Sequence, residues 1–181
     1  MELKRRFIAL NLPADAINEI KKIQKLIKDK NLFIGKFTEL ENLHLTLKFL
    51  GEITNDEVDE AKEKLNDISF KIFEGQLGEF GVFSDHFVKI IWIELIGDVF
   101  ELQKQIDEKL KNLYKPEKRF MSHITIARVK RADNKKTLIE FLKNIKHKKI
   151  KFKIDSFYLM ESELKSDGPI YKVIEKYSLK S

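Results

Sequence analysis

Two four-residue stretches, His44-Leu45-Thr46-Leu47 and His123-Ile124-Thr125-Ile126, are the most informative part of this chain. Each places a histidine and a threonine two residues apart in an apolar segment that favours a strand. Because residues i and i+2 of a strand share a face, each strand presents an imidazole beside a hydroxyl, and its two apolar side chains point to the other face. Two such strands facing each other would surround one small cavity with two imidazoles and two hydroxyls. Such a cavity suits acid–base chemistry on a phosphate.

The composition indicates a globular chain without cysteine chemistry. Of the 181 residues 43% are hydrophobic, which is enough to bury a core, and the lack of cysteine excludes disulfides, thiolate metal sites and a cysteine nucleophile. No stretch approaches the roughly 18 apolar residues of a membrane span, and the N-terminus is unlike a secretory signal. We therefore expect a cytoplasmic protein without membrane contact. The high content of Lys, Glu and Ile also favours a thermophilic source.

The net charge of +6, with 35% charged residues, favours anionic partners, including nucleic acid. Lysine-rich surfaces are common for other reasons, so the charge alone does not establish a partner.

The order of predicted elements repeats along the chain. After an opening strand at residues 6–12, each half is expected to contain a helix, a histidine strand, a second helix and two further strands. In the first half these are a helix capped by Asp15, strand 43–50, a helix opened by the capping box Thr54/Glu57, and strands 70–80 and 87–95. In the second half they are a helix opened by the box Asp98/Glu101, strand 121–129, a helix from near Asp133, and strands 150–160 and 170–178.

This order predicts an α+β fold. We expect two pseudo-symmetric lobes with mainly antiparallel sheets and outer helices around a central cleft. Since no Pro/Gly/Ser linker separates the halves, residues 1–181 are expected to form one domain, an internal duplication with approximate halves 1–96 and 97–181. Equivalent strands of the halves would then bring the two histidines together.

The four polar residues of the two stretches are the predicted catalytic group: His44, Thr46, His123 and Thr125. Burying such a polar pair at matching positions of a duplicated unit costs free energy that core packing does not require. Histidine titrates near pH 6.5, so one ring can act as a base while the other acts as an acid. Threonine hydroxyls can donate to phosphate oxygens. No metal and no cofactor is expected, although two histidines could bind a metal with help from remote ligands.

Residues beside the two stretches are weaker candidates. Lys48 is in phase with His44, so it can face the cleft and meet RNA phosphate, or it can simply face solvent at a strand end. Arg128 follows the second stretch, but strict alternation puts it on the face opposite His123, and it reaches the site only if the strand ends or bulges there. Phe49 is also out of phase and is expected in the core.

The remaining aromatic and histidine residues are expected to be structural. Trp92 lies in an apolar strand and is predicted to be core, whereas His86 and His147 are predicted to be on the solvated surface. The lysine-rich stretch around His147 could still contact RNA electrostatically.

The paired His-x-Thr motifs resemble the two-histidine (2H) phosphoesterase superfamily, and within it the RNA 2′,3′-cyclic phosphodiesterases, also called 2′-5′ RNA ligases. The similarity covers essentially the whole chain. The segments that carry it are Arg6-Phe7-Ile8-Ala9-Leu10 with Leu12-Pro13, Leu43 to Gly51, Phe80-Gly81-Val82-Phe83, Ile91-Trp92, Ser122 to Arg128, and Gly168-Pro169-Ile170-Tyr171. The family often has proline where this chain has Ser122.

This resemblance implies metal-independent hydrolysis of RNA ends that carry a 2′,3′-cyclic phosphate, tRNA fragments among them, to 2′-phosphomonoesters. It implies that His44 is the proton donor, that His123 is the proton acceptor, and that Thr46 and Thr125 hold the phosphate. The motifs themselves are too alike to assign acid and base. Alternatives are 2′-5′ RNA ligation, hydrolysis of small substrates such as ADP-ribose 1″,2″-cyclic phosphate, and a non-catalytic module that binds RNA ends. We expect a monomer without an obligate protein partner.

Overall fold

A computed structural model describes residues 2–166 and 168–181. Its elements, in chain order, are β1 (Lys4–Asn11), α1 (Ala14–Lys30), β2 (Ile34–Phe37), the 3₁₀ turn η1 (Leu40–Asn42), β3 (His44–Ile53), α2 (Asn55–Asn66), β4 (Phe73–Val82), β5 (Ile90–Ile96), α3 (Val99–Leu110), β6 (His123–Arg131), α4 (Lys135–Asn144), β7 (Lys151–Ile154), β8 (Ser156–Lys165) and β9 (Gly168–Ser178). The predicted α+β class is confirmed.

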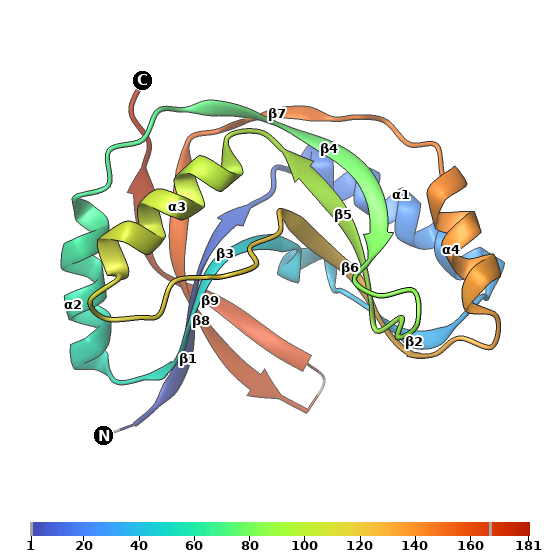
Figure 1. The fold of residues 1–181 in the computed structure, drawn as a ribbon, viewed down its shortest axis with the longest axis horizontal. Helices are drawn as coiled ribbons and strands as arrows, with labels where there is room; N and C mark the ends of the chain where they lie inside the picture. Colours follow the sequence, from blue (N-terminus) through green and yellow to red (C-terminus); the bar gives the residue numbers. More distant parts are fainter. Residues whose placement is uncertain (1, 167) are drawn as a thin grey trace.

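The strands form one curled antiparallel sheet that runs through both lobes (Figure 1). Its order is β7-β4-β5-β6-β3-β1-β8-β9, with β2 added beside β6. The two histidine strands, β3 and β6, are neighbours at the middle of this order, and one pair of residues, Leu45 and Ile124, joins them in antiparallel register. The first lobe therefore holds β3, β1, β8 and β9, and the second holds β6, β5, β4, β7 and β2.

Two of the helices, α1 and α3, pack on the lobe opposite to that of the strand they follow. The helix α1 follows β1 of the first lobe but packs on β6 of the second, and α3 follows β5 of the second lobe but packs on β3 of the first. In Figure 1, α2 and α3 lie over one end of the sheet, and α1 and α4 lie over the other. Each lobe thus combines elements from both ends of the chain, and the predicted halves, residues 1–96 and 97–181, do not coincide with the lobes.

The register suggests a different repeat boundary. β1 pairs with β3 as β5 pairs with β6, so the two first strands are equivalent. We infer that one repeat runs β1-α1-β3-α2-β4 and the other runs β5-α3-β6-α4-β8. The boundary then falls between β4 and β5, earlier than residue 96, and β5 opens the second repeat instead of closing the first.

A β-bulge interrupts the first histidine strand directly after its motif. Thr46 pairs with Ala9 and Lys48 pairs with Ile8, so Leu47 has no partner in β1. An extra residue reverses the alternation of side chains beyond it. As a result Leu47 and Lys48 are both buried, and Phe49 is exposed on the face that carries Thr46.

The prediction that Lys48 faces the cleft is therefore wrong. Its side chain is only 3% exposed and forms an ion pair with Asp107 of α3, while its ammonium also donates to the carbonyl of Lys115 at 2.9 Å. The second carboxylate oxygen of Asp107 accepts from the Gln103 side chain at 2.9 Å and from the Glu117 amide at 2.8 Å. This network ties β3 to α3 and to the segment that leads into β6.

The second histidine strand carries the equivalent bulge. Trp92 pairs with Thr125 and Ile91 pairs with Ala127, which leaves Ile126 without a partner in β5. The carbonyl of Ile126 instead accepts from the Thr38 amide at 2.8 Å and from the Gln24 side chain at 3.1 Å.

The strand β2 lies along the far side of this bulge. It approaches β6 closely because Gly35 has no side chain: a Cβ there would lie 2.1 Å from the carbonyl oxygen of Arg128. This strand was absent from the sequence-based prediction.

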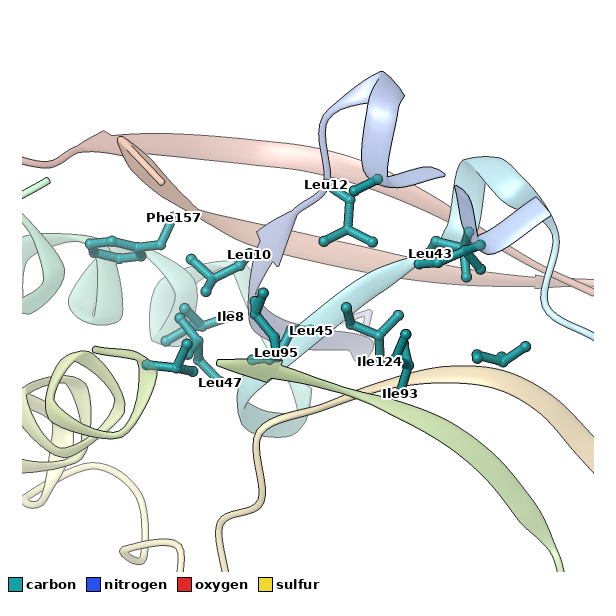
Figure 2. Packing of buried hydrophobic residues seen from close by; sticks show 14 of the residues in the cluster. Ile8, Leu10, Leu12, Leu43, Leu45, Leu47, Ile93, Leu95, Ile124 and Phe157 are labelled. Carbon is teal, nitrogen blue, oxygen red and sulfur yellow. The ribbon is translucent and has the colours of Figure 1, made fainter. Parts of the chain in front are cut away.

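The main core lies between the sheet and the helices. Strands from both lobes contribute to it, as Figure 2 shows with Ile8, Leu10, Leu45, Leu47, Ile93, Leu95, Ile124 and Phe157. On the opposite, concave face a second small cluster of Phe7, Ala9 and Met160 packs with Tyr158 and Tyr171. The apolar residues of both motifs enter the main core, as the alternation predicted.

The helix starts confirm one predicted cap and contradict two. The box Thr54/Glu57 is formed at α2, with both reciprocal hydrogen bonds present. At α3 the N-cap Asp98 makes no side-chain capping bond, so the second predicted box is wrong. The residue before α1 is Pro13, whose fixed φ suits a helix start, and Asp15 lies within the first turn instead of capping it.

Replacing Lys48 with methionine is expected to lower the free energy of unfolding by about 3 kcal/mol, because Asp107 would remain buried without its counter-charge. Urea unfolding measures the change. The substitution Lys104→Met removes an exposed lysine from α3 and should leave the midpoint nearly unchanged. A small loss for Lys48→Met, equal to that of the control, would contradict the buried ion pair.

Candidate active site

A cavity of about 810 Å³ opens on the concave face where the lobes meet. Its lining includes five of the six residues predicted for the site, namely His44, Thr46, His123, Thr125 and Arg128. Lys48 is not among the lining residues. The walls come from both lobes, from the β2–η1 segment and from the β8–β9 hairpin.

The two motifs cross at the middle of the sheet. Leu45 pairs with Ile124 on the core side. Antiparallel pairing then puts His44 across from Thr125 and Thr46 across from His123 on the cavity side. The four side chains thus form an approximate two-fold arrangement of alternating imidazoles and hydroxyls.

Each imidazole is oriented by a carbonyl two residues earlier in its own chain segment. The Nδ1 of His44 donates to the carbonyl of Asn42 at 2.7 Å, and the Nδ1 of His123 donates to the carbonyl of Met121 at 2.8 Å. Because a carbonyl only accepts, Nδ1 must carry the hydrogen in both rings. The Nε2 atoms are therefore the ones available for proton transfer.

The His44 ring is held by two aromatic rings as well. Its centroid lies 5.0 Å from those of Phe7 and Tyr171, the latter edge-on. Its Nε2 accepts from the Thr46 hydroxyl at 3.0 Å. The closing hairpin supports this arrangement, since the buried amide of Asn42 donates to the carbonyl of Pro169 at 2.8 Å.

The His123 ring has a different neighbourhood. Phe83 contacts it edge-on, with centroids 4.9 Å apart, and packs in turn against Trp92. Trp92 pairs with Thr125, so it lies on the cavity-facing side of the sheet and is only partly buried. It is not the core residue that was predicted. Ser122, at the position where the resemblance leads one to expect proline, is buried, and its hydroxyl donates to the carbonyl of Leu95.

The environment of His44 disfavours its protonation. Burial lowers the pKa of His44 from its ordinary value, and the positive charge of Arg128, together with that of His123 whenever this ring is protonated, lowers it further. The hydrogen bond to the Asn42 carbonyl raises the pKa, but this effect is smaller than that of burial. The free protein therefore holds a proton on His44 less readily than a histidine in water does.

Phe49 and Arg128 occupy equivalent positions, five residues beyond the histidine of each motif. The bulges turn both side chains onto the cavity side, and both line the cavity. Arg128 is exposed and Phe49 is 70% exposed. The prediction of Phe49 as a core residue is wrong, because strict alternation took no account of the bulge.

The two other histidines lie outside the cavity lining. His86 is exposed, as predicted. His147 is partly buried: its Nε2 lies 2.9 Å from the Gly78 carbonyl, and its ring packs against Phe80 at 5.0 Å. The prediction of a solvated surface residue is wrong for His147. Among residues 2–166 and 168–181, no group of three or more His, Cys, Asp or Glu side chains could hold a metal ion.

Comparison with known proteins fits this geometry. The family described as LigT-like phosphoesterases matches residues 10–92 and 94–171. The chain belongs to this family. Among its LigT-like relatives, an RNA 2′,3′-cyclic phosphodiesterase of Methanocaldococcus jannaschii is 38% identical over 178 residues, covering 96% of this chain and 99% of the relative. One of Aquifex aeolicus with the same description is 33% identical and covers 99% of both chains.

Solved structures share the LigT-like fold. A crystal structure from Thermus thermophilus superimposes with a TM-score of 0.82 at 24% identity, covering 97% of this chain and 98% of the other. Apo LigT of Escherichia coli gives a TM-score of 0.80 at 20% identity over the full length of both chains. None of the described helices is long and apolar enough to cross a membrane.

The His44 ring is expected to titrate below about pH 6.5 in an NMR titration of the free protein. Since the folded protein binds this proton less tightly than the unfolded chain, His44 makes the free energy of unfolding fall as the pH drops below about 6.5. Arg128→Gln and His123→Gln should each raise the pKa of His44 by removing a positive charge. An unchanged pKa in both variants would contradict the electrostatic coupling across the cavity.

Proposed function

We propose that this protein hydrolyses RNA 2′,3′-cyclic phosphate ends to 2′-phosphomonoesters. The observation that carries the proposal is the pair of His-Thr motifs that cross in one cavity, each imidazole with Nδ1 bound to a backbone carbonyl and Nε2 on the side that can transfer a proton. Support comes from relatives described as RNA 2′,3′-cyclic phosphodiesterases that match nearly the whole chain. RNA ends, including tRNA fragments, are the proposed partners.

In the proposed reaction the two imidazoles act on opposite sides of the phosphorus. The Nε2 of His123 removes a proton from water as its oxygen attacks the phosphorus. The bond from phosphorus to the 3′ oxygen breaks, and the Nε2 of His44 gives that oxygen a proton. The product carries a 2′-phosphate and a free 3′ hydroxyl, and the proton returns from His123 to His44 through solvent. General acid and base steps of this kind each contribute about 10²–10⁴-fold.

Substrate binding is expected to favour the protonated form of His44, which the acid step requires. In the free protein burial and nearby positive charge disfavour protonation of this ring. A bound phosphate adds a negative charge beside it, and an adjacent opposite charge favours the protonated form. His44 would therefore take up a proton from solvent as the cyclic phosphate enters the cavity.

The remaining cavity residues would hold the substrate. The Thr46 hydroxyl donates to His44 in the free protein and is close enough to turn to a phosphate oxygen instead. Thr125, across from His44, would donate from the other motif, and the Arg128 guanidinium would balance the phosphate charge. Phe49 offers an exposed ring in the cavity on which the terminal base can stack.

An oligonucleotide ending in a 2′,3′-cyclic phosphate should be converted to the 2′-phosphate product at an unchanged rate in EDTA. His44→Ala and His123→Ala should each lower kcat by about 10²-fold or more while leaving the circular dichroism spectrum and melting temperature close to wild type. Product mass and resistance to a 3′-specific phosphatase identify the isomer.

A 3′-phosphate product, or turnover that requires added metal, would refute this mechanism. If either histidine variant keeps near-wild-type turnover, the protein is not a two-histidine catalyst. If the wild-type protein binds the oligonucleotide but does not turn it over, binding of RNA ends without catalysis becomes the better explanation.

A substrate with bridging sulfur at the 3′ position tests which histidine is the acid. A thiolate can leave without a proton. The decrease in kcat caused by His44→Ala should therefore be at least about tenfold smaller on this substrate. The loss caused by His123→Ala should persist, since water must still be deprotonated. The reverse pattern would exchange the two assignments.

A further inference from the structure

The loop between β4 and β5, residues 83–89, connects the catalytic cavity to the protein surface. At its start Phe83 contacts the His123 ring at 4.9 Å, and directly after its end Ile90 lines the cavity. The loop is held at two further points: the Lys89 carbonyl accepts from the Val129 amide at 2.8 Å, and the carbonyl of residue 86 accepts from a lysine of α4.

Phe87 stands out from this anchored loop. Its side chain is 72% exposed, among the most exposed of the large apolar residues described. The Lys135 ammonium lies 5.9 Å from the centre of its ring and donates to the His86 carbonyl at 2.7 Å. A single exposed aromatic is ordinary on a protein surface, but here a cation lies over the ring, and the loop that carries it runs from Phe83, which contacts His123, to Ile90, which lines the cavity.

Three cations without acidic partners in the described part of the chain lie on β6 and at the start of α4, the two elements that contact this loop and the strand after it. Arg128 pairs with Ile90 in the sheet register, and Lys130 follows two residues later. Both are exposed, and neither they nor Lys135 has a carboxylate within ion-pair distance among the described residues. Asp85 is the only acidic residue of loop 83–89, so the surface of Phe87, Arg128, Lys130 and Lys135, here named the Phe87 rim, is net positive.

The cations in the first-lobe wall of the cavity are paired instead. Arg5 pairs with Glu52 at 3.1 Å, and the buried Arg6 pairs with Glu161 at 2.9 Å. Neutralised pairs of this kind attract a polyanion weakly compared with free cations. Charge therefore favours exit of a bound RNA strand over the second lobe.

We propose that the Phe87 rim binds the nucleotides that precede the cyclic phosphate in a single-stranded RNA substrate. Phe87 supplies a stacking surface for one base, and Lys130 and Lys135 contact backbone phosphates, while Arg128 faces the terminal phosphate in the cavity. This combination of an aromatic platform and a basic track is the one that single-stranded RNA requires. The proposal rests on the proposed function for the identity of the terminal phosphate, and it predicts a preference for oligonucleotides over mononucleotides that depends on this surface.

The test compares two substrates in one double variant, Phe87→Ala/Lys135→Ala. With a decauridylate ending in 2′,3′-cyclic phosphate, KM should rise about tenfold or more with kcat unchanged, as expected from losing one stacked base and one phosphate contact. With uridine 2′,3′-cyclic monophosphate, which cannot reach the rim, kcat/KM should stay within about twofold of wild type. The slope of log kcat/KM against log salt for the decamer should become shallower by about 0.7 for the lost contact.

The matched control is Phe100→Ala/Lys104→Ala, which removes an exposed phenylalanine and an unpaired exposed lysine from α3. It should leave both substrates unaffected. Equal losses on both substrates in the Phe87 variant would overturn the proposal, because they would show that the loop acts only through Phe83 and His123. Unchanged decamer kinetics would overturn it as well.

Direct binding separates this proposal from the proposed function. Fluorescence anisotropy of a 5′-labelled decauridylate with a terminal 2′-phosphate requires no turnover. The wild type could fail to turn over either substrate and still bind the decamer more tightly than the Phe87 variant does. In that case the hydrolysis proposal is refuted, and the proposal that the Phe87 rim binds RNA is supported. Equal affinity of the wild type and the Phe87 variant for the decamer would refute the proposed role of the Phe87 rim, whatever the catalytic outcome.

Discussion

The pairing of Leu45 with Ile124 is the contact on which the active site depends. It joins the two lobes into one sheet, and it buries the apolar side of both motifs in the same core. Because side chains alternate across a strand, this one register brings both histidines and both threonines to the concave face. A slip of one residue in either strand would send one motif's polar pair into the core, so the apolar packing specifies the catalytic geometry.

The paired bulges determine what surrounds that group. The extra residues at 47 and 126 reverse the alternation beyond each motif, which brings Phe49 and Arg128 to the cavity and turns Lys48 inward. Equivalent bulges thus bring different groups to the cavity: the aromatic ring of Phe49 from the first lobe and the guanidinium of Arg128 from the second. The asymmetry extends to the histidines, since Phe7 and Tyr171 enclose His44 while Phe83 contacts His123.

Sequence patterns predicted the parts of the fold that follow from local rules. Alternation in each motif was enough to assign His44 and Thr46 to one face, and the reciprocal spacing of Thr54 and Glu57 identified a helix start. The bulges were not predictable in this way, because neither strand has a glycine at the bulged position and the signal lies in pairing with β1 and β5. The four residues of β2 were missed because a strand this short depends on its neighbour, here through Gly35 beside Arg128.

The crossing of α1 and α3 between the lobes means that neither inferred repeat is complete by itself. A polypeptide containing one repeat alone would have an unpaired sheet edge and would lack the strand on which its first helix packs, since α1 contacts β6 and β4 pairs with β5. Two copies exchanging these elements would satisfy both needs in a symmetric dimer with a histidine from each copy. Because both motifs lie in one chain, their surroundings can differ, so that a single site has two chemically distinct sides.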